Sequence, residues 1–592
     1  MLENSLIHAF NTAFQTLYSK TADEKFVSFQ KTRTEFEGDM TIVVFPFVKT
    51  IGKSPEAIAN EIGTQLLKDS ELVSGFNVVK GFLNLSISDE YWLKFFNDNF
   101  SNESFGKISQ QDNKKIVIEY SSPNTNKPLH LGHVRNNLLG WSVAEILKAN
   151  GHEVTKVNLV NDRGIHICKS MIAWKYWGGL TPEESNTKGD KLVGNMYVRF
   201  DKELKAQLAQ LISEGQTAEM AAKNAPLMLE AQEMLRQWEA GDAETRKLWE
   251  TMNNWVYEGF NQTYTNLGID FDKTYYESQT YLSGKSIVLE GLDKQSFYRK
   301  DDNSIWCDLQ QDGLDEKLLL RSDGTSVYIT QDLGTAEERH DHYKADQMIY
   351  VVGNEQNYHF DVLKLILKKL GRQWADGIEH LSYGMVELPE GKMKSREGTV
   401  VDADDLVDEM VHTARQMTEE LGKASNLSEI EADKLYKQIG LGALKYYILK
   451  VDPKKTMMFN PAESIDFNGN TGPFIQYTHA RIRSVLQKAV DAGYLQGEIE
   501  VFANTGKEKH IVKILHQFPA VVSQAGEQRS PALIANYMYD LAKEYNQFYQ
   551  ACPIIREENE SLKKFRIGLS LFVANVLKMS GRLLGMEMPD RM

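Results

Sequence analysis

The sequence has few cysteines and no long apolar run. Its three cysteines, Cys168, Cys307 and Cys552, lie far apart and in no paired spacing, which argues against a disulfide framework and against a structural zinc site. No segment approaches the roughly 18 uninterrupted apolar residues of a membrane span, and the acidic start MLENSLIHAF lacks the basic and apolar parts of a signal peptide. These absences predict a cytoplasmic protein without a membrane segment.

An excess of positive charge is also missing. The 592 residues carry 67 basic and 82 acidic side chains, which gives a formal net charge of -15 at pH 7. A nucleic-acid-binding protein is expected to present a basic surface. Net charge does not exclude a local basic groove, so the charge argues against such a function without ruling it out.

Short apolar segments in the middle of the chain predict buried strands of a parallel sheet. Helical stretches separate these segments, which is the α/β pattern. Residues from about 181 to 264 are instead charged, alanine-rich and helical, so we expect a helical insertion in the α/β domain. The predicted strands are IVIEY (116–120), VTKVNLV (154–160), SVYIT (326–330) and QMIYVVG (347–353).

The flanking regions differ from the α/β region. Near the N-terminus, SPEAIANEIGTQLLKDSELV predicts a helix capped by Ser54, and GFNVVKGFLNLSIS alternates as strands do. After Val401 the pattern is helical to the end of the chain. We therefore expect a multidomain α/β protein. The predicted parts are an α+β domain (1–112), a Rossmann-like parallel-sheet domain (113–401), a helical connecting region (402–465) and an all-helical domain (466–592).

The stretch SSPNTNKPLHLGHVR, residues 121–135, joins the first predicted strand to a helix. Phosphates bind at such junctions, because free backbone N–H groups point there. Gly132 leaves room for a ligand against the backbone, and the N–H groups of His130 and His133 could stabilise charge on the α-phosphate of a nucleotide. As an isolated motif, the pair is equally compatible with one histidine capping the helix.

GKMKSREGTVV, residues 391–401, is on its own typical of a solvated basic loop. Together with HLGH, however, it resembles the HIGH and KMSKS signatures of class I aminoacyl-tRNA synthetases. The chain resembles the arginyl-tRNA synthetase family over nearly its whole length. Further stretches that carry the resemblance are GDMTIVVFPFVKTIGKSPEAIA, GFLNL, SDGT with YITQD, VVGNEQNYHF, NTGPFIQYTHARI, FYQACPI and LLGMEMPDRM.

The resemblance implies that the α/β domain is catalytic and uses ATP with Mg²⁺, without a dedicated protein metal site. Ser395 stands where class I enzymes usually have the second lysine of KMSKS, with Lys394 one position early. Many arginyl enzymes instead carry a lysine just before HIGH, and Lys127 occupies that place. Which basic residue replaces the missing lysine stays open. The implied catalytic and ATP-binding residues are Lys127, His130, Gly132, His133, Lys392, Lys394 and Ser395.

The resemblance also implies an L-arginine site. A guanidinium has five N–H donors in a planar fork, so its pocket needs carboxylates. Asp332 is either such a ligand or a helix cap in a strand-end loop, and Glu277 is equally compatible with either role. We expect Glu119 to support the residues around the α-amino and carboxylate groups. The implied arginine-binding residues are Glu119, Ser122, Asn124, Glu277, Tyr328, Asp332 and Gln356.

The resemblance further implies that the helical domain binds the anticodon of tRNA(Arg) and that the first domain contacts the same tRNA. RNA readers stack bases on aromatic rings, although tyrosines at helical spacing are equally compatible with a core. Arginine activation is expected to require bound tRNA, and the enzyme is expected to be a monomer. The implied tRNA-binding residues are Tyr477, Arg481, Tyr549 and Met592, with His479 beside them.

Two other interpretations stay open. The chain could be a class I synthetase for another amino acid, which Tyr328 and Asp332 argue against. It could also be an RNA-binding or scaffold protein derived from a synthetase. Loss of the HLGH histidines or of the basic residues near Lys392 would favour that interpretation, and neither loss is present. No hydrolytic editing domain is assigned, because a site built for a guanidinium rejects lysine without one.

Overall fold

The computed structural model describes residues 2–33, 35–108, 113–387, 401–420, 427–494 and 506–592. The chain forms two compact units, each built from segments that are separate in the sequence. The first unit contains Met1–Phe105, Ile482–Gln517 and Lys543–Val576, and the second contains Gly106–Arg481, Phe518–Ala542 and Leu577–Met592.

The first unit contains an antiparallel sheet with strand order β1-β2-β4-β3. Helices α1 and α3 pack together, and α3 packs on β3 and β4. The helix predicted after Ser54 is confirmed, and its cap oxygen accepts the Ala57 N–H over 3.3 Å. The two predicted strands are β3 and β4. The bounds are α1 (Leu2–Tyr18), β1 (Phe29–Lys31), β2 (Met40–Val43), α3 (Pro55–Asp69), β3 (Val73–Val79), β4 (Phe82–Ile87) and α4 (Asp89–Asn99).

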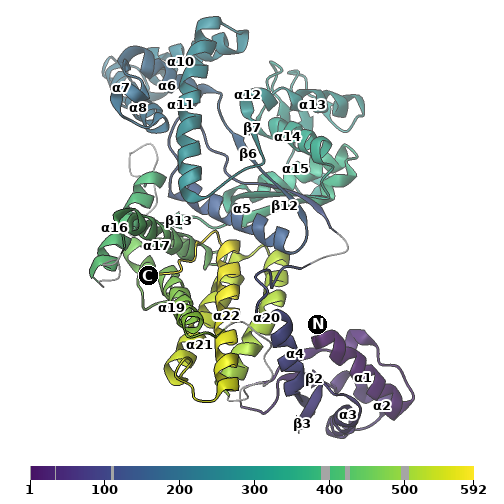
Figure 1. The fold of residues 1–592 in the computed structure, drawn as a ribbon. Helices are drawn as coiled ribbons and strands as arrows, with labels where there is room; N and C mark the ends of the chain where they lie inside the picture. Colours follow the sequence, from purple (N-terminus) through teal and green to yellow (C-terminus); the bar gives the residue numbers. More distant parts are fainter. Residues whose placement is uncertain (1, 34, 109–112, 388–400, 421–426, 495–505) are drawn as a thin grey trace. The chain divides into compact units, whose positions relative to one another are not determined.

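The second unit contains a parallel sheet with strand order β12-β11-β5-β6-β7. Buried side chains of its strands form one core with helices α13, α14 and α15, which lie beside the sheet in Figure 1. The predicted α/β architecture is confirmed. The bounds are β5 (Lys115–Glu119), β6 (Glu153–Val160), β7 (Lys273–Tyr276), β11 (Gln347–Gly353), β12 (Ile378–Tyr383), α13 (Ser283–Asp293), α14 (Tyr328–Tyr343) and α15 (Asn357–Lys369).

One of the predicted strands is wrong. The segment 326–330 is not a strand, because α14 begins at Tyr328. Its β-branched residues do not alternate between two faces. Ile329, Leu333 and Ala336 recur at helical spacing and are all buried. Asp332 therefore lies inside a helix and not in a loop at a strand end.

The chain between β6 and β7 forms the predicted helical insertion (Figure 1). Its helices pack on one another, chiefly α6 with α8 and α10, and α8 with α11. The helix α11 then returns the chain to the sheet, where β7 begins. The bounds are α6 (Ile165–Trp177), α7 (Pro182–Ser185), α8 (Gly189–Ser213), α9 (Ala218–Asn224), α10 (Pro226–Ala240) and α11 (Ala243–Leu267).

The described part of the chain after Val401 is helical, as predicted, except for the short strand β14 (Met457–Met458). This strand pairs in parallel with β13 (Val386–Glu387). None of the described helices combines the length and the apolar character that a membrane span requires. The helices are α16 (Ala403–Glu420), α17 (Glu429–Leu449), α18 (Pro461–Ser464), α19 (Gly472–Asp491), α20 (Lys507–Glu527), α21 (Pro531–Ala551) and α22 (Glu560–Leu583).

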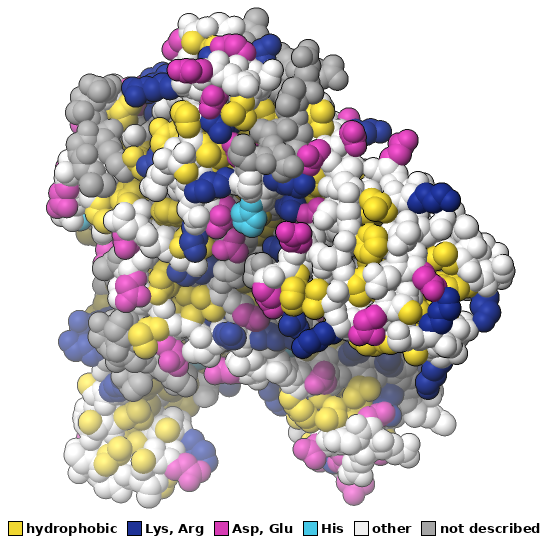
Figure 2. Space-filling model, turned by 90° about the horizontal axis from the view of Figure 1, so that it is seen from below, with side chains coloured by type: hydrophobic (Ala, Val, Ile, Leu, Met, Phe, Trp, Pro, Cys, Tyr) yellow, Lys and Arg dark blue, Asp and Glu magenta, His cyan; other side chains and the backbone are white. Residues whose placement is uncertain are grey.

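Basic and acidic side chains are intermingled over the face shown in Figure 2. No large surface of one sign of charge stands out there, although acidic residues outnumber basic ones in the sequence. Any electrostatic attraction of a nucleic acid to this face is therefore expected to depend on local groups of basic residues.

Candidate active site

Most of the predicted arginine-binding residues follow strands of the parallel sheet. Ser122 and Asn124 follow β5, Glu277 follows β7, and Gln356 lies in the short helical turn after β11. Because these strands are parallel, all four residues lie at the same edge of the sheet, where ligands of α/β proteins bind. Their roles as arginine ligands had been predicted from the resemblance alone.

A cavity of about 680 Å³ opens at this edge. Of the predicted arginine-binding residues, Asn124, Glu277 and Tyr328 line it. The side chain of Tyr328 is 79% exposed, so the protein interior does not hold its ring. The volume is within the range of small-molecule pockets.

Glu277 is a predicted ligand whose pKa departs strongly from its usual value. The pKa of this carboxyl group is raised to about 7, chiefly by burial, while Arg163 opposes the shift and the nearby Asp162 contributes to it. Near neutral pH the side chain is therefore poised between its neutral and charged forms. A bound guanidinium would favour the charged form, because opposite charges at close range lower the pKa of a carboxyl group.

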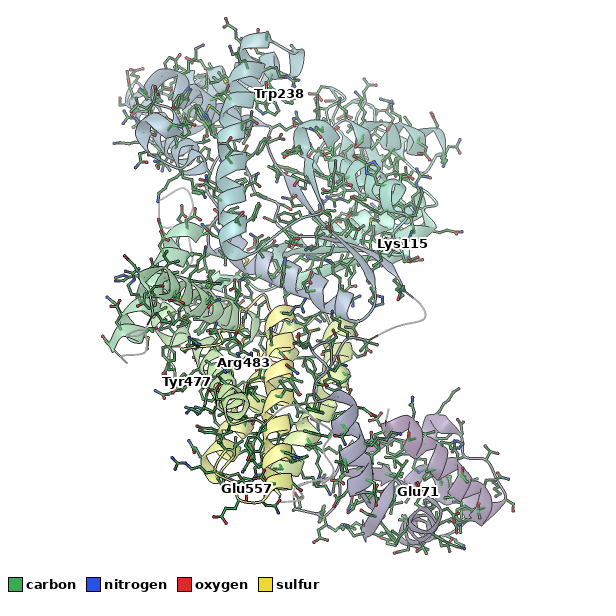
Figure 3. All side chains as sticks on the ribbon, viewed as in Figure 1. Glu71, Lys115, Trp238, Tyr477, Arg483 and Glu557 are labelled. Carbon is green, nitrogen blue, oxygen red and sulfur yellow. The ribbon has the colours of Figure 1, made fainter. Side chains whose placement is uncertain are left out.

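Arg163, which was not predicted from the sequence, also lines the cavity. Its guanidinium lies 3.9 Å from the ring centroid of Tyr281 and 5.4 Å from that of Trp238, and it pairs with Glu239 over 2.8 Å. Trp238 and Glu239 come from α10 of the insertion (Figure 3). The cavity wall therefore already binds one guanidinium. The position of Arg163 soon after β6 was the available signal.

Asp162 was also missed, and it is fully partnered. This carboxylate is 1% exposed and accepts hydrogen bonds from the backbone N–H of Ser278 over 2.8 Å, from the Ser278 hydroxyl over 2.7 Å and from the Tyr257 hydroxyl over 2.8 Å. Ser278 directly follows Glu277 in the chain. Asp162 thus fixes the backbone beside the predicted ligand and has no need of a substrate partner.

Asp332 lies in the second turn of α14, so the alternative that it caps a helix is wrong. Its Oδ2 atom is 2.5 Å from Nε2 of His359 on α15. The side chain of Asp332 is 34% exposed. The carboxylate is therefore accessible from solvent, but a bound guanidinium would have to share it with His359.

Glu119, at the end of β5, is buried and forms an ion pair with Arg339 of α14. Arg339 is another residue that the sequence analysis missed, and its guanidinium lies 5.0 Å from the ring centroid of Tyr275. The Ser122 hydroxyl donates to Oε1 of Glu119 over 3.1 Å. Glu119 thus contacts a predicted ligand while its own charge is balanced inside the protein.

The HLGH motif forms the start of α5 (Leu131–Ala149), and His130 is the N-cap residue. Nδ1 of His130 accepts the Gly132 N–H over 3.1 Å, and Nδ1 of His133 accepts the His130 N–H over 3.1 Å. Both Nδ1 atoms are therefore acceptors, so the proton of each neutral ring lies on Nε2. The capping interpretation is right for Nδ1 of His130, and it leaves Nε2 available as a donor.

Burial keeps both imidazoles neutral. It lowers the pKa of His130 to about 4, with Lys127 adding to the effect, and it lowers the pKa of His133 well below the usual value. Burial also lowers the pKa of the Lys127 ammonium group. The two rings lie close together, with centroids 3.9 Å apart. The motif presents neutral N–H donors beside a helix N-terminus, an arrangement suited to a developing negative charge.

The predicted residues Lys392, Lys394 and Ser395 lie outside the described residues. The chain that follows them is bonded to the HLGH motif. The Leu131 N–H donates to the Val401 carbonyl over 3.1 Å, and the Ala403 N–H donates to the Leu129 carbonyl over 2.9 Å. Val401, the last residue of the second predicted stretch, and the start of α16 are therefore bonded to the backbone around HLGH.

The predicted tRNA-binding residues divide between the two units. Tyr477, Arg481 and Met592 belong to the second unit, and Tyr549 to the first. Tyr477, labelled in Figure 3, and Arg481 both lie on α19, with the guanidinium 4.7 Å from the ring centroid. Nδ1 of His479 contacts the Pro589 carbonyl over 3.0 Å, so α19 binds the C-terminal segment.

Three family models match the sequence. The model described as tRNA synthetases class I (R), catalytic domain, matches residues 97–460. The DALR anticodon binding domain matches 475–592, and the arginyl tRNA synthetase N terminal domain matches 3–87. The chain belongs to the arginyl-tRNA synthetase family. The predicted resemblance is thereby confirmed.

Relatives of this family are similar over the full length of the chain. A protein of Bacteroides thetaiotaomicron named arginine–tRNA ligase is 58% identical, and one of Flavobacterium psychrophilum with the same name is 55% identical, with 100% of each chain covered. The solved structure of Thermus thermophilus arginyl-tRNA synthetase matches with a TM-score of 0.79 at 25% identity and covers 100% of both chains. The predicted fold class is confirmed.

Class I synthetases use ATP, so the α/β unit of this family member contains a nucleotide-binding catalytic domain. Among the residues that the structure describes, no group of three histidine, cysteine, aspartate or glutamate side chains is arranged to hold a metal ion. The cavity lining combines amides and the carboxylates of Glu239 and Glu277 with the cations of Arg163, Lys285 and Arg321.

Proposed function

We propose that this member of the arginyl-tRNA synthetase family activates L-arginine with ATP and then attaches it to the 3′-terminal ribose of tRNA(Arg). In the first step a carboxylate oxygen of arginine attacks the α-phosphorus of ATP, and the bond to pyrophosphate breaks. In the second step the ribose hydroxyl attacks the carbonyl carbon of arginyl-adenylate. AMP leaves, and the hydroxyl proton is lost. No covalent enzyme intermediate is required.

The observation that carries the proposal is the fixed tautomer of the HLGH pair. The Nε2–H groups of His130 and His133 are donors that require no protonation, so they can stabilise the α-phosphate at neutral pH. Lys127 adds a positive charge just before the motif, and Gly132 leaves the helix N-terminus open. We assign the same task to Lys392, Lys394 and Ser395 from the resemblance alone.

The cavity at the sheet edge is the proposed place for arginine. The arginine guanidinium would pair with Glu277, which lines the cavity beside Tyr328, and with Asp332, which follows the lining residue Gln331 in the chain, because paired carboxylates match the planar fork of donors. Ser122, Asn124 and Gln356, which follow β5 and β11, would bind the α-amino and carboxylate groups, with Glu119 orienting Ser122. Lysine lacks the fork and would leave these carboxylates partly unpaired.

Mg²⁺ is proposed to accompany ATP. The described residues do not form a protein cage for it, and magnesium in phosphoryl chemistry is bound mainly by phosphate oxygens and water. Its contribution when bound is to neutralise phosphate charge. The residues named above would still have to place the α-phosphorus against the arginine carboxylate.

The remaining predictions also stay proposals. They are the domain division at residues 112, 401 and 465, the monomeric state, the cytoplasmic location, and tRNA binding through Tyr477, Arg481, Tyr549 and Met592. ATP–pyrophosphate exchange, measured with each amino acid in the presence and absence of tRNA(Arg), tests the proposed function. Exchange with arginine that depends on tRNA supports it. Exchange with another amino acid, or none with arginine, contradicts it.

A further inference from the structure

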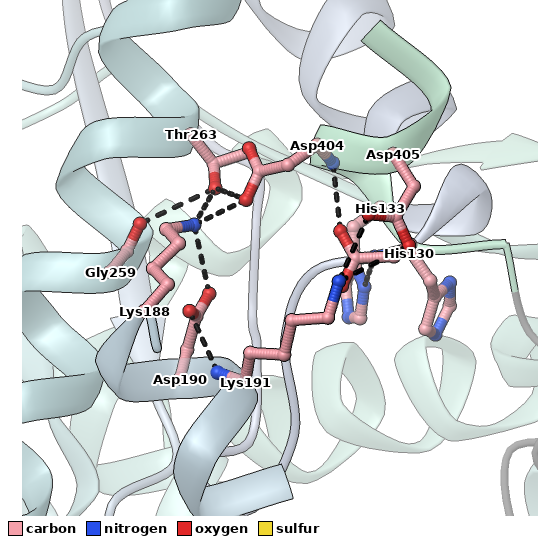
Figure 4. A network of polar contacts seen from close by, with 10 residues as sticks. His130, His133, Lys188, Asp190, Lys191, Gly259, Thr263, Asp404 and Asp405 are labelled. Atoms are coloured by element: carbon pink, nitrogen blue, oxygen red, sulfur yellow. Dashed lines mark hydrogen bonds and ion pairs between the residues drawn. The ribbon is translucent and has the colours of Figure 1, made fainter. Parts of the chain in front are cut away.

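A network of polar contacts joins the helical insertion to the first turn of α16. Lys188, the residue before α8, places its ammonium group 3.1 Å from Oδ2 of Asp190, 2.6 Å from Oγ1 of Thr263 and 2.5 Å from Oδ2 of Asp404. The Asp190 side chain is 0% exposed and that of Lys188 is 18% exposed. Figure 4 shows the ammonium group between the two carboxylates. One cation therefore partners two aspartates, one from the insertion and one from α16.

The first turn of α16 holds the HLGH motif through backbone hydrogen bonds. The bonds from Ala403 to Leu129 and from Leu131 to Val401 lie on either side of His130. A short antiparallel bridge pairs His130 with the residue before Ala403. Any shift of this turn would therefore move the backbone that carries the His130 ring.

Asp404 connects the network to that bridge. Its backbone N–H donates to Oδ1 of Asp402 over 2.8 Å, and Asp402 is the bridge partner of His130. Its Oδ2 atom accepts bonds from Lys188 and from the Thr263 hydroxyl, the latter over 3.2 Å. The side chain and the backbone of one residue thus link the insertion to the HLGH motif.

The helix α8 approaches the motif at a second point. Gly194 lies against Pro128, and a Cβ atom on this glycine would be only 2.8 Å from Cδ of the proline. Gly259 of α11 leaves room for Asp190, since a Cβ atom there would be 2.6 Å from Cγ of the aspartate. The insertion is therefore fitted closely both to the loop before HLGH and to the network around Lys188.

We infer that Lys188 is a positioning residue for arginine activation. It holds Asp190 and Asp404 together and so fixes the turn that orients His130. The inference rests on the proposed function and adds a role for the insertion in it. Lys188 itself lies in the protein network and is assigned no substrate contact. Its loss should therefore slow the reaction more than it weakens arginine binding, because small misplacements of catalytic groups reduce the rate strongly.

The chain offers a matched control in Lys191, which joins the same two elements. Its ammonium group pairs with Asp405 over 2.9 Å, but the two side chains are 46% and 63% exposed. Exposed pairs of this kind contribute little, because water and salt screen them. Lys188→Met and Lys191→Met remove the same charge at the start of α8 and differ in burial and in contact with Asp404.

The test compares kcat and KM for arginine in tRNA-dependent ATP–pyrophosphate exchange, together with thermal unfolding. For Lys188→Met we expect kcat to fall by about tenfold or more and KM to change by less than about twofold, with Lys188→Arg restoring part of kcat. Lys191→Met should behave as wild type. Equal activity of the two folded methionine variants would overturn the inference, as would a loss in kcat that matches the unfolded fraction.

If Lys188→Met does not fold, Asp404→Asn tests the positioning role, because asparagine has the size of aspartate but lacks its charge. It should also lower kcat, and the double variant with Lys188→Met, where folded, should lose little more than the stronger single variant. Full activity of Asp404→Asn, additive losses, or failure of both single variants to fold would overturn the positioning role. Failure of the proposed function would be visible separately, as a lack of arginine-dependent exchange in wild type and in Lys191→Met.

Discussion

Nδ1 of His133 accepts a hydrogen bond from the backbone N–H of His130, 3.1 Å away. This bond fixes the tautomer of His133 and leaves its Nε2–H as a donor. His133→Asn keeps an acceptor near the Nδ1 position and removes the Nε2–H group. We expect a stable protein in which adenylate formation is slower by roughly 10²-fold or more, as for loss of one preorganised donor. His133→Gln, which keeps an N–H near the Nε2 position, should retain more activity. Pre-steady-state adenylate formation measures both, and near-wild-type rates for His133→Asn would refute the donor role.

Asp332 tests the arginine pocket. Asp332→Asn keeps an oxygen that can accept from His359 but loses the charge that a guanidinium needs. We expect kcat/KM for arginine to fall by about 10²-fold or more, with little change in thermal unfolding or in tRNA affinity at fixed salt. The control is Asp341→Asn on the same helix, where Asp341 pairs with Lys344 at an exposed site. Equal arginine kinetics in the two variants would remove Asp332 from the pocket.

The raised pKa of Glu277 predicts that arginine binding depends on pH. Its pKa of about 7 means that below this pH arginine must bind with loss of a proton from the carboxyl group. The KM for arginine should therefore fall as pH rises from 5.5 to about 7, by no more than about tenfold per pH unit, and then level off. In Glu277→Gln the KM should be higher and this pH dependence reduced. The pKa of Glu277 also depends on the charges of Asp162, Arg163 and Asp332, which are unchanged in this variant. An unchanged pH profile in Glu277→Gln would assign the titration to another group.

The raised pKa of Glu277 also affects stability: rising pH favours arginine binding but destabilises the ligand-free protein. The folded protein holds its Glu277 proton up to about pH 7, whereas an unfolded chain releases it near the ordinary value of 4.5. Below pH 4.5 the carboxyl group is protonated in both states and does not change the free energy of unfolding. As pH rises from 4.5 to 7, the free energy of unfolding of the ligand-free protein falls, by at most about 1.4 kcal/mol per pH unit. Glu277→Gln should lack this loss. Denaturant unfolding of both proteins at pH 5 and 7 measures it, and an equal loss in both would contradict the assignment.

Lys127 is the proposed substitute for the missing lysine of the second motif. Lys127→Ala should reduce adenylate formation more than Lys394→Ala does, because Lys127 lies beside the HLGH rings and influences their pKa values. Single-turnover rates at saturating ATP make the comparison. Small and equal losses in the two variants would show that neither lysine supplies the charge.

Local patterns were sufficient for much of the fold. The apolar runs of β5, β6 and β11 and the capped helix after Ser54 were predictable because burial and capping are encoded within a few residues. The segment 326–330 was not. Its β-branched residues favour a strand, but tertiary packing buries Ile329 and Leu333 on one face of a helix. In segment 326–330, tertiary packing therefore outweighed the β-strand propensity of the residues.

The candidate site was likewise only partly predictable from the sequence. HLGH was recognisable from its position after a strand, but the hydrogen bonds that fix both tautomers depend on the cap geometry of α5. Arg163, Arg339 and Lys188 were missed, because each acquires its role from partners that are distant in the sequence. Apart from the position of Arg163 soon after β6, such pairings leave no local pattern in the sequence.

The central claim is that the site selects arginine through its guanidinium and attaches it to tRNA(Arg). Charging of purified tRNA(Arg) with labelled arginine and, in parallel, labelled lysine tests it directly. We predict that arginine is attached and that lysine is attached at least about 10³-fold less efficiently, because lysine lacks the planar fork and leaves the carboxylates of the site partly unpaired. Lysine charging within about tenfold of arginine charging, or no attachment of arginine, would contradict the account.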